Sequence, residues 1–140
     1  MKVKDIMATD VVFVDATTKT PEIAKVLKQN GIGAVPVMKN GNVVGIITDR
    51  DIILRVLADN KDINTVTAEQ IMSVNAVCIE ESDDIDRAVD LMAEYQIKRL
   101  PVLSKGKLIG IISLGDLAIE QIHIDEAGEA LNGISRGISH

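Results

Sequence analysis

The chain has 140 residues, enough for one compact domain or for two small halves that share a core. Hydrophobic residues make up 46% and charged residues 26%, a balance typical of a folded protein and not of a disordered one. With one Phe, one Tyr and no Trp, the core must be aliphatic. The net charge of −6 gives no general attraction to phosphate backbones, so we expect no nucleic-acid partner.

The composition also bears on the cellular compartment. Cys78 is the single cysteine, so an internal disulfide is excluded, as fits a reducing compartment. The first residues lead into no long apolar segment of the signal-peptide type. Apolar runs such as the one near residues 52–54 are far too short to cross a bilayer. We therefore expect a cytoplasmic protein that does not enter the membrane.

The sequence repeats itself at a spacing of 65 residues without any gap. Several of the matched residues are Gly or Pro, whose backbone geometry makes a chance match improbable. The matched pairs include Ile6 and Ile71, Met7 and Met72, Val12 and Val77, Ile32 and Ile97, Pro36 and Pro101, Gly45 and Gly110, and Asp51 and Asp116. We interpret this as an internal duplication with repeats at residues 1–64 and 65–124, followed by a tail, 125–140, to which we assign no chemistry.

In the first repeat, the β-prone run 11–14 predicts a strand. A helix should begin near Pro21, which suits a first helical turn. Two strands follow at 34–38 and 42–48, joined by Asn40-Gly41, a strong hairpin signal. The sequence then predicts a closing helix over 49–58.

The second repeat follows the same order. A strand is predicted at 76–79 and a helix from near Asp83, and Lys105-Gly106 stands at the position of the first hairpin turn. The closing helix should span 114–124. Each repeat is thus a β-α-β-β-α unit of an α/β (α+β) fold, too small to bury its own sheet face. We expect the two sheets to pack face to face with pseudo-twofold symmetry.

The closing helices are apolar on more than one face. The residues concerned are Ile52, Ile53, Leu54, Val56 and Leu57 in the first repeat, and Leu117, Ile119, Ile122 and Ile124 in the second. One interpretation is a thick core with a few exposed leucines. The other is a homodimer formed through helices 49–58 and 114–124, since a monomer would expose a large apolar patch. We expect the homodimer.

The second hairpin strand of each repeat ends in a hydroxyl residue with a carboxylate three positions later. The segments are 45–51, which contains Thr48 and Asp51, and 110–116, which contains Ser113 and Asp116. This spacing matches a capping box, in which the two side chains satisfy the first amides of a helix. It also matches a ligand site, with amides and hydroxyl facing an anion and the carboxylate accepting hydrogen bonds from a ribose diol. The motif alone leaves both alternatives open.

Taken together, Asp5-Ile6-Met7, residues 31–37, residues 45–51 and their counterparts in the second repeat resemble the cystathionine-β-synthase (CBS) domain pair, or Bateman module. The resemblance covers residues 1–124 and is greatest to prokaryotic members in which the pair is the entire protein. It implies two clefts, each built from both repeats, in which aliphatic residues enclose an adenine and the aspartate holds the ribose. The residues implied for one cleft are Val12, Ile32, Gly33, Ala34, Pro36, Ile111, Ser113 and Asp116. Those for the other are Val77, Ile97, Lys98, Arg99, Pro101, Ile46, Thr48, Arg50 and Asp51.

The two implied clefts differ in charge. Lys98 and Arg99 stand where the first repeat has Gly33 and Ala34, and Arg50 stands where the second has Gly115. A solvated surface charge is the simpler interpretation of a single Lys or Arg. If the family geometry holds, these cations gather near the phosphates of a ligand, which arginine suits well.

We therefore expect a non-enzymatic sensor that binds AMP, ADP or ATP and needs no cofactor. The alternative is an interaction or scaffold protein with empty clefts, or with another adenosyl ligand such as S-adenosylmethionine or NAD(H). The sequence does not name a downstream protein partner. Cys78, His123 and His140 are widely separated and lack zinc-site spacing, so we expect no metal. No His or Cys stands beside a plausible base, so we expect no catalytic residue.

Overall fold

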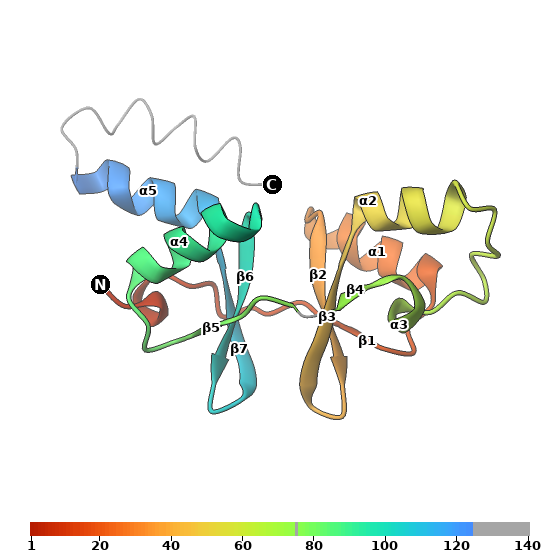
Figure 1. The fold of residues 1–140 in the computed structure, drawn as a ribbon, viewed down its shortest axis with the longest axis horizontal. Coiled ribbons are helices and arrows are strands. Elements are labelled where there is room, and N and C mark those ends of the chain that lie inside the picture. Colours follow the sequence, from red (N-terminus) through yellow and green to blue (C-terminus); the bar gives the residue numbers. More distant parts are fainter. Residues whose placement is uncertain (75, 125–140) are drawn as a thin grey trace. The chain divides into compact units, whose positions relative to one another are not determined.

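A computed structural model describes residues 1–74 and 76–124 of the chain, which divides into two compact units (Figure 1). The central unit is Val12–Ala76. The split unit combines Met1–Val11 with the chain from Val77 onward. Each unit has its own sheet and its own hydrophobic core. The mixed α+β architecture with two repeats is as predicted.

The central unit contains a four-stranded sheet in the order β1-β2-β3-β4. β1 runs parallel to β2, and the other neighbouring strands are antiparallel. Its elements are β1 (Val14–Asp15), α1 (Thr20–Asn30), β2 (Ala34–Lys39), β3 (Asn42–Thr48), α2 (Asp49–Ile52), the π-helix η2 (Ile53–Leu57), α3 (Ala68–Ile71) and β4 (Ser73–Val74).

The split unit repeats this order around a three-stranded sheet, β5-β6-β7. Its opening segment forms a short 3-10 helix at the position of α3, and a single bridge of Ala8 with Ile111 at the position of β4. The elements are η1 (Val3–Asp5), β5 (Ile79–Glu80), α4 (Ile85–Tyr95), β6 (Arg99–Ser104), β7 (Lys107–Ser113) and α5 (Leu114–Ile124). The tail 125–140, with His140, lies outside the described residues.

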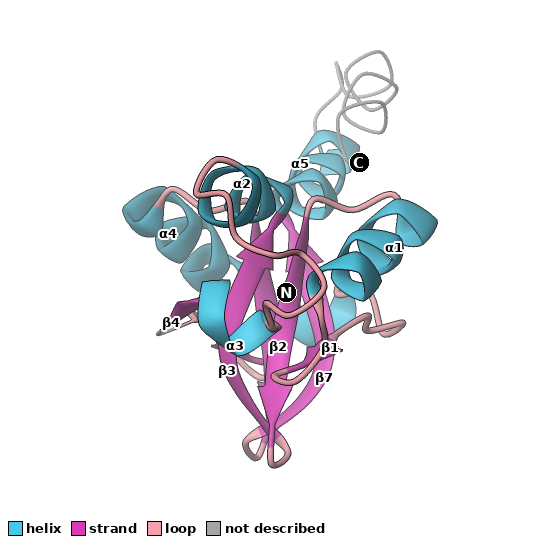
Figure 2. Cartoon of the chain, turned by 90° about the vertical axis from the view of Figure 1, so that its right-hand side faces the viewer, coloured by secondary structure: helices cyan, strands magenta, loops and turns pink. Residues whose placement is uncertain are grey.

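Both predicted hairpins are present, and their turns have the backbone that the sequence signal requires. Asn40 and Gly41 have φ of 53° and 80°, and Lys105 and Gly106 have φ of 52° and 80°. Positive φ at both central residues is the type I′ arrangement, whose twist matches that of the flanking strands. In the central unit, α2 begins where β3 ends, at the opposite end of the hairpin from this turn (Figure 2).

The segment that opens each sequence repeat packs in the unit formed by the other repeat. In the split unit, Val3 N donates to Asp83 O at 2.9 Å, Lys4 N donates to Glu81 O at 3.1 Å, and Ala8 pairs with Ile111. In the central unit, Thr20 N donates to Val66 O at 3.0 Å, and Gly45 pairs with Val74. The compact units thus change over at 11/12 and 76/77, whereas the sequence repeats change over at 64/65.

Close approach of these opening segments depends on a glycine in each sheet. A Cβ on Gly45 would lie 2.5 Å from Met72 Sδ and 2.7 Å from the carbonyl oxygen of Ser73. A Cβ on Gly110 would lie 2.6 Å from Met7 Sδ and 2.9 Å from the carbonyl oxygen of Ala8. Both glycines were matched by the duplication, and the structure gives the physical reason.

Each core is aliphatic and lies within one unit. In the central unit, Ile23 and Leu27 on one face of α1 pack with Val35, Val37 and Ile47 of the sheet. In the corresponding core of the split unit, the fully buried residues include Val3, Ala88, Leu100, Val102 and Ile112. Val3 comes from the opening segment, so that segment supplies core volume as well as hydrogen bonds.

Four predicted elements differ from the structure in their bounds or in helix type. The strands predicted at 11–14 and 76–79 are present only as the pairs Val14–Asp15 and Ile79–Glu80. Pairing with the hairpin begins only there, so β propensity alone set the prediction too early. The helix expected from Asp83 begins at Ile85, because the side chain of Asp84 accepts the N–H of Asp86 and caps it. The closing helix of the first repeat continues to Leu57, but as η2, with Ala58 N bonded to Ile53 O at 2.8 Å.

Candidate functional site

Both units place a hydroxyl and a carboxylate where a strand ends and a helix begins. In the central unit, Asp51 N donates to Thr48 Oγ1 at 3.1 Å, and Thr48 N donates to Asp51 Oδ2 at 2.9 Å. In the split unit, Asp116 N donates to Ser113 Oγ at 3.0 Å, and Ser113 N donates to Asp116 Oδ2 at 3.1 Å. The capping interpretation of the motif is therefore confirmed in both repeats.

Capping uses only part of each carboxylate. The reciprocal bond goes to Oδ2, and an ionised carboxylate offers about four acceptor positions on its two oxygens. The side chain of Asp51 is 15% exposed, and Asp116 is half-buried. Oδ1 of each aspartate is outside the capping box, so capping and acceptance of a ligand hydroxyl are compatible at the same side chain.

The start of the first hairpin strand lies beside this junction in each unit. Ala34 is the strand partner of Thr48, and Asp49 N donates to Gly33 O at 2.9 Å. In the split unit, Arg99 is the partner of Ser113, and Leu114 N donates to Lys98 O at 2.7 Å. The backbone therefore holds the loop before the hairpin against the first helical residue in both repeats.

The aliphatic residues of the expected site lie along the same hairpins. Pro36 is paired with Ile46, and Pro101 with Ile111, in equivalent register. Both prolines are fully buried, and the two isoleucines are half-buried. At the edges of the two cores lie four further partly buried members of the expected set: Val12, Ile32, Val77 and Ile97.

Each of the two expected clefts takes residues from both units. Within one unit, the structure brings together some residues expected for one cleft and some expected for the other. In the central unit, Gly33 and Ala34 of one set adjoin Thr48 and Asp51 of the other. In the split unit the same holds for Lys98 and Arg99 beside Ser113 and Asp116. The two complete residue sets stay a prediction.

The charges at these junctions differ between the units, as the sequence indicates. In the central unit, Asp49 and Arg50 are exposed, and Asp49 Oδ1 accepts the N–H of Arg50 at 2.8 Å. A Cβ on Gly33 would lie 3.3 Å from Asp49 Oδ2, so this carboxylate faces the loop. Leu114 takes the place of Asp49 in the split unit, where Lys98 is exposed and Arg99 half-buried. The charged residues thus lie on the helix side of the central junction, and on the loop and strand side of the junction in the split unit.

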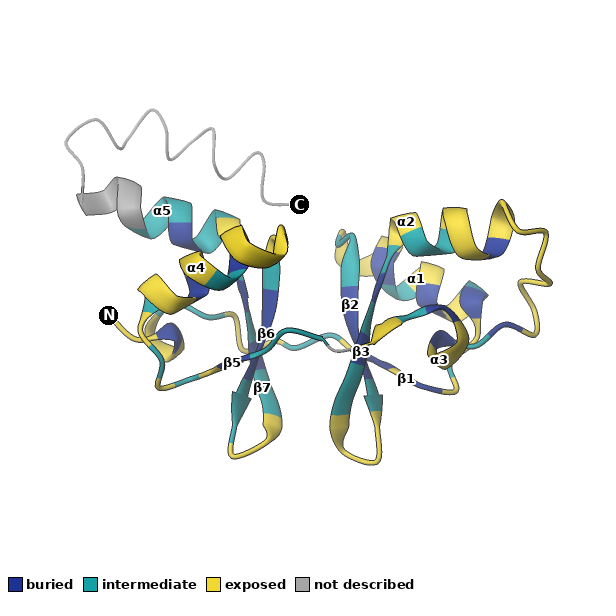
Figure 3. Cartoon of the chain, in the orientation of Figure 1, coloured by how far each residue is buried: buried dark blue, intermediate teal, exposed yellow. Residues whose placement is uncertain are grey.

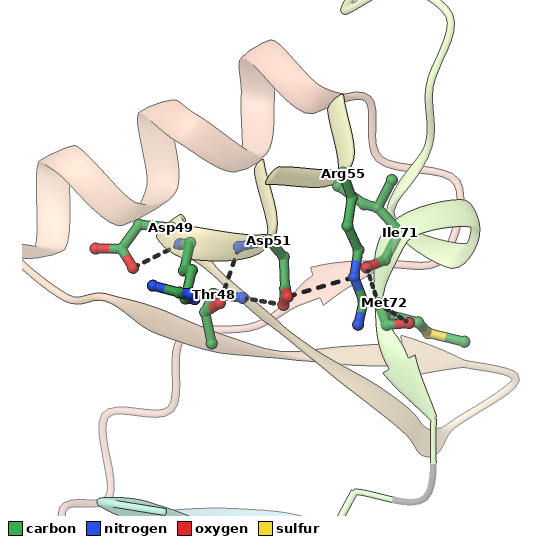
Figure 4. A network of polar contacts seen from close by, with 7 residues as sticks. Thr48, Asp49, Asp51, Arg55, Ile71 and Met72 are labelled. Atoms are coloured by element: carbon green, nitrogen blue, oxygen red, sulfur yellow. Dashed lines mark hydrogen bonds and ion pairs between the residues drawn. The ribbon is translucent and has the colours of Figure 1, made fainter. Parts of the chain in front are cut away.

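Arg55 is a residue of the central junction that sequence reasoning missed (Figure 4). Its Nε lies 3.7 Å from Asp51 Oδ1, and its Nη1 donates to the carbonyl oxygens of Ile71 at 3.0 Å and Met72 at 3.3 Å. The guanidinium therefore links the Asp51 carboxylate to the segment that enters β4. The four-residue spacing of Asp51 and Arg55 on a helix was the available signal.

Other chemistry has little support in the described part of the chain. Burial raises the pKa of the Cys78 thiol, and the neighbouring Glu80 carboxylate raises this pKa further, so the thiol stays protonated and unreactive at neutral pH. Within residues 1–74 and 76–124, His, Cys, Asp and Glu form no cluster of three that could hold a metal ion. The side chain of His123 lies outside the described residues.

Among the described helices, none combines the length and apolar character needed to span a membrane.

Comparison with protein families finds the CBS domain twice in the chain, at residues 3–58 and 68–123. The CBS domain-containing protein YhcV of Bacillus subtilis is 41% identical over 138 residues, which cover 99% of this chain and 98% of YhcV. Both matched ranges include one strand–helix junction with its hydroxyl and carboxylate. The duplication and the family match therefore identify the same two repeats.

Solved structures with the same architecture include two that contain bound small molecules or metal ions. The CBS domain pair of protein MJ0100, in complex with 5′-methylthioadenosine and S-adenosyl-L-methionine, matches with a TM-score of 0.78 and 29% identity, over 89% of this chain and 98% of that one. Hypoxic Response Protein I, with two coordinated zinc ions, matches with a TM-score of 0.78 and 30% identity, over 84% and 97%.

Proposed function

Because the chain belongs to the CBS domain family and carries two CBS domains, we propose that it is a non-enzymatic regulatory module that binds adenine nucleotides. The ligand class proposed is AMP, ADP or ATP. One observation carries the proposal: both repeats keep a hydroxyl and a carboxylate at the strand–helix junction, and each carboxylate keeps Oδ1 outside its capping box. Helix capping alone gives no reason why this junction, more than the start of any other helix, should carry the same arrangement in both repeats.

The proposed site residues are those that the family resemblance implies. Asp51 and Asp116 would accept the ribose hydroxyls, and Ile46 and Ile111 would contact the adenine. Arg50, Lys98 and Arg99 would meet the phosphates, which suits their charge and, for arginine, the planar fork of the guanidinium. The ligand would act by population shift, favouring the arrangement of the two units that binds it better and so changing the surface offered to a partner protein.

A second adenosyl ligand is favoured by a specific observation. The MJ0100 domain pair, 29% identical to this chain, is described in complex with 5′-methylthioadenosine and S-adenosyl-L-methionine. These molecules carry the same adenine and ribose as AMP but no phosphate. They would therefore use the ribose carboxylates and the aliphatic residues as AMP would, whereas the three cations would meet no phosphate and, of the two ligands, only S-adenosyl-L-methionine offers them an anion, its carboxylate.

We also propose that the module is a cytoplasmic homodimer formed through the closing helices. Ile53, Leu54 and Leu57 in η2 are 55%, 46% and 56% exposed, and most of the helix that follows α2 is coloured as exposed in Figure 3. Large aliphatic side chains exposed together on one helix are typical of an interface. Light scattering at micromolar concentration should give twice the monomer mass, and Leu54→Lys with Leu57→Lys should give the monomer mass.

The test of ligand binding is a thermal-shift screen followed by calorimetry. A ligand at about 100 times its Kd stabilises the native state by about 2.7 kcal/mol, which raises the Tm measurably. We expect a rise with AMP, ADP or ATP. Asp51→Ala and Asp116→Ala should each weaken binding about 10- to 100-fold at their own site. A Tm unchanged by nucleotides, S-adenosylmethionine and NAD(H) would favour a scaffold protein instead.

A further inference from the structure

The two aspartates proposed to hold ribose have different neighbours one helical turn further along the chain. Arg55 follows Asp51 by four residues, and its Nε lies 3.7 Å from Asp51 Oδ1 (Figure 4). Glu120 stands at the same position after Asp116 and is half-buried. Within the described residues, no cation forms an ion pair with Asp116. One carboxylate therefore has a cationic neighbour and the other an anionic one.

Arg55 is held in place by more than this ion pair. Its Nη1 donates to the carbonyl oxygens of Ile71 and Met72, at 3.0 and 3.3 Å. Those carbonyls belong to the end of α3 and the residue that precedes β4. Two hydrogen bonds to the backbone tie the guanidinium to the segment before β4, so we expect it to stay beside Asp51 when a ligand arrives.

The capping boxes cannot distinguish the two aspartates, because both use Oδ2 at 2.9 and 3.1 Å. At Oδ1 they differ. A ribose hydroxyl that donates to Asp51 Oδ1 meets an oxygen that lies 3.7 Å from a guanidinium nitrogen, and this positive charge lowers the acceptor strength of the carboxylate. Among the described residues Asp116 has no such cation, and the negative charge of Glu120 adds to the field that attracts a hydroxyl proton.

We propose that Arg55 is a positioning residue that makes Asp51 the weaker of the two ribose acceptors. This inference rests on the proposed function. It assigns the difference between the two acceptors to the residues at positions 55 and 120 and not to the capping motif, which the two repeats share. The expected difference between the sites is about tenfold in the ratio of AMP to 2′-deoxy-AMP affinity, which corresponds to weakening one hydrogen bond to a charged group by about half.

The experiment isolates each site and measures how strongly it reads the ribose 2′-hydroxyl. Asp116→Asn leaves only the Asp51 carboxylate, and Asp51→Asn leaves only the Asp116 carboxylate, while the amide oxygen still accepts a capping bond. Calorimetry with AMP and with 2′-deoxy-AMP gives the two affinities and their ratio. We expect the ratio of AMP to 2′-deoxy-AMP affinity to be about tenfold larger in Asp51→Asn than in Asp116→Asn, because contacts to the phosphate cancel in this ratio.

Two further variants should reverse the order. Arg55→Gln, added to Asp116→Asn, removes the charge but keeps a donor for the carbonyls, and should raise both AMP affinity and the ratio. Glu120→Arg, added to Asp51→Asn, creates the i, i+4 pair in the split unit and should lower both. This second arm stays informative even where loss of Arg55 impairs folding, because it leaves the central unit unchanged.

The outcomes separate this inference from the proposed function. Equal ratios of AMP to 2′-deoxy-AMP affinity at the two sites, or an Arg55→Gln effect equal for AMP and 2′-deoxy-AMP, would overturn the role of Arg55 and leave nucleotide binding standing. Wild-type protein that binds neither AMP, ADP nor ATP would overturn both. A purely structural Arg55 would lower the Tm without moving the ratio.

Discussion

The opening segments of the two repeats support their sheets to different degrees. In the central unit, Ser73–Val74 forms a fourth strand on β3, and Arg55 binds the carbonyls just before it. In the split unit, the equivalent contact is the single pair Ala8 and Ile111, and Glu120 replaces the arginine. The glycine that admits the segment is the same in both. The duplication has therefore kept the glycine that backbone contact requires, while the side chains that reinforce this contact have diverged.

The largest effect should come from deleting residues 1–11. The split unit would lose the fully buried Val3 and the hydrogen bonds of Val3 and Lys4 to the loop before α4. We expect the free energy of unfolding of that unit to fall by on the order of 5 kcal/mol. Hydrogen exchange is the measurement, and the amides of Leu100 and Ile112 should lose more protection than those of Val35 and Ile47.

The control for this deletion is Lys4→Ala at an exposed position of the same segment, which should change stability by less than about 0.5 kcal/mol. Equal loss of protection in the two units would contradict the division of the chain into a central and a split unit.

A smaller effect is expected from adding one methyl group at the glycine of each sheet. Gly45→Ala and Gly110→Ala should each lower the free energy of unfolding by about 2–4 kcal/mol, since the new Cβ meets a backbone carbonyl that cannot turn away. The effect at Gly45 should be the greater, because its carbonyl contact is 2.7 Å and that of Gly110 is 2.9 Å. Urea unfolding measures both.

Gly33→Ala is the matched control, because its Cβ would meet only a side-chain oxygen, at 3.3 Å, and the second repeat carries Lys98 there. We expect a change below about 1 kcal/mol. Alanine at position 45 or 110 that left stability at the wild-type value would show that the opening segments do not press on the sheets.

The smallest expected effect concerns Arg55 and Glu120, which follow the two aspartates by four residues. Arg55→Ala removes two donors from backbone carbonyls and a partly exposed ion pair, and should cost about 1–2 kcal/mol of unfolding free energy. Glu120→Ala should stay within about 0.5 kcal/mol of wild type. Urea unfolding of both variants under one set of conditions makes the comparison, and equal losses would remove the reinforcing role assigned to Arg55.

Much of the fold was predictable from local sequence. Asn40-Gly41 and Lys105-Gly106 predicted both hairpins because positive φ at consecutive residues leaves few alternatives. Pro21 placed the start of α1, and the spacing of Thr48 and Asp51 predicted the cap that the structure confirms. These features are fixed by contacts within a few residues, and such contacts can be read from one segment of the chain.

What could not be predicted depends on contacts between distant segments. Nothing in the sequence near Val3 indicates that it is buried beside Leu100, and the two-residue lengths of β1 and β5 are set by their partners in the hairpins. α3 was also missed, although Thr67 and Gln70 have capping-box spacing and do form one. Arg55 was missed because a search for what two repeats share passes over the positions at which they differ.

The exchange of opening segments bears on how such a protein could arise. A single repeat with this connectivity has no place for its own first eleven residues and leaves one edge of its sheet short of a partner. Two separate copies would satisfy each other by reciprocal exchange, as in domain-swapped dimers. Fusion of the genes would then convert an association that depends on concentration into one held by the chain itself. The ancestor expected from this connectivity is a swapped dimer of half-length chains.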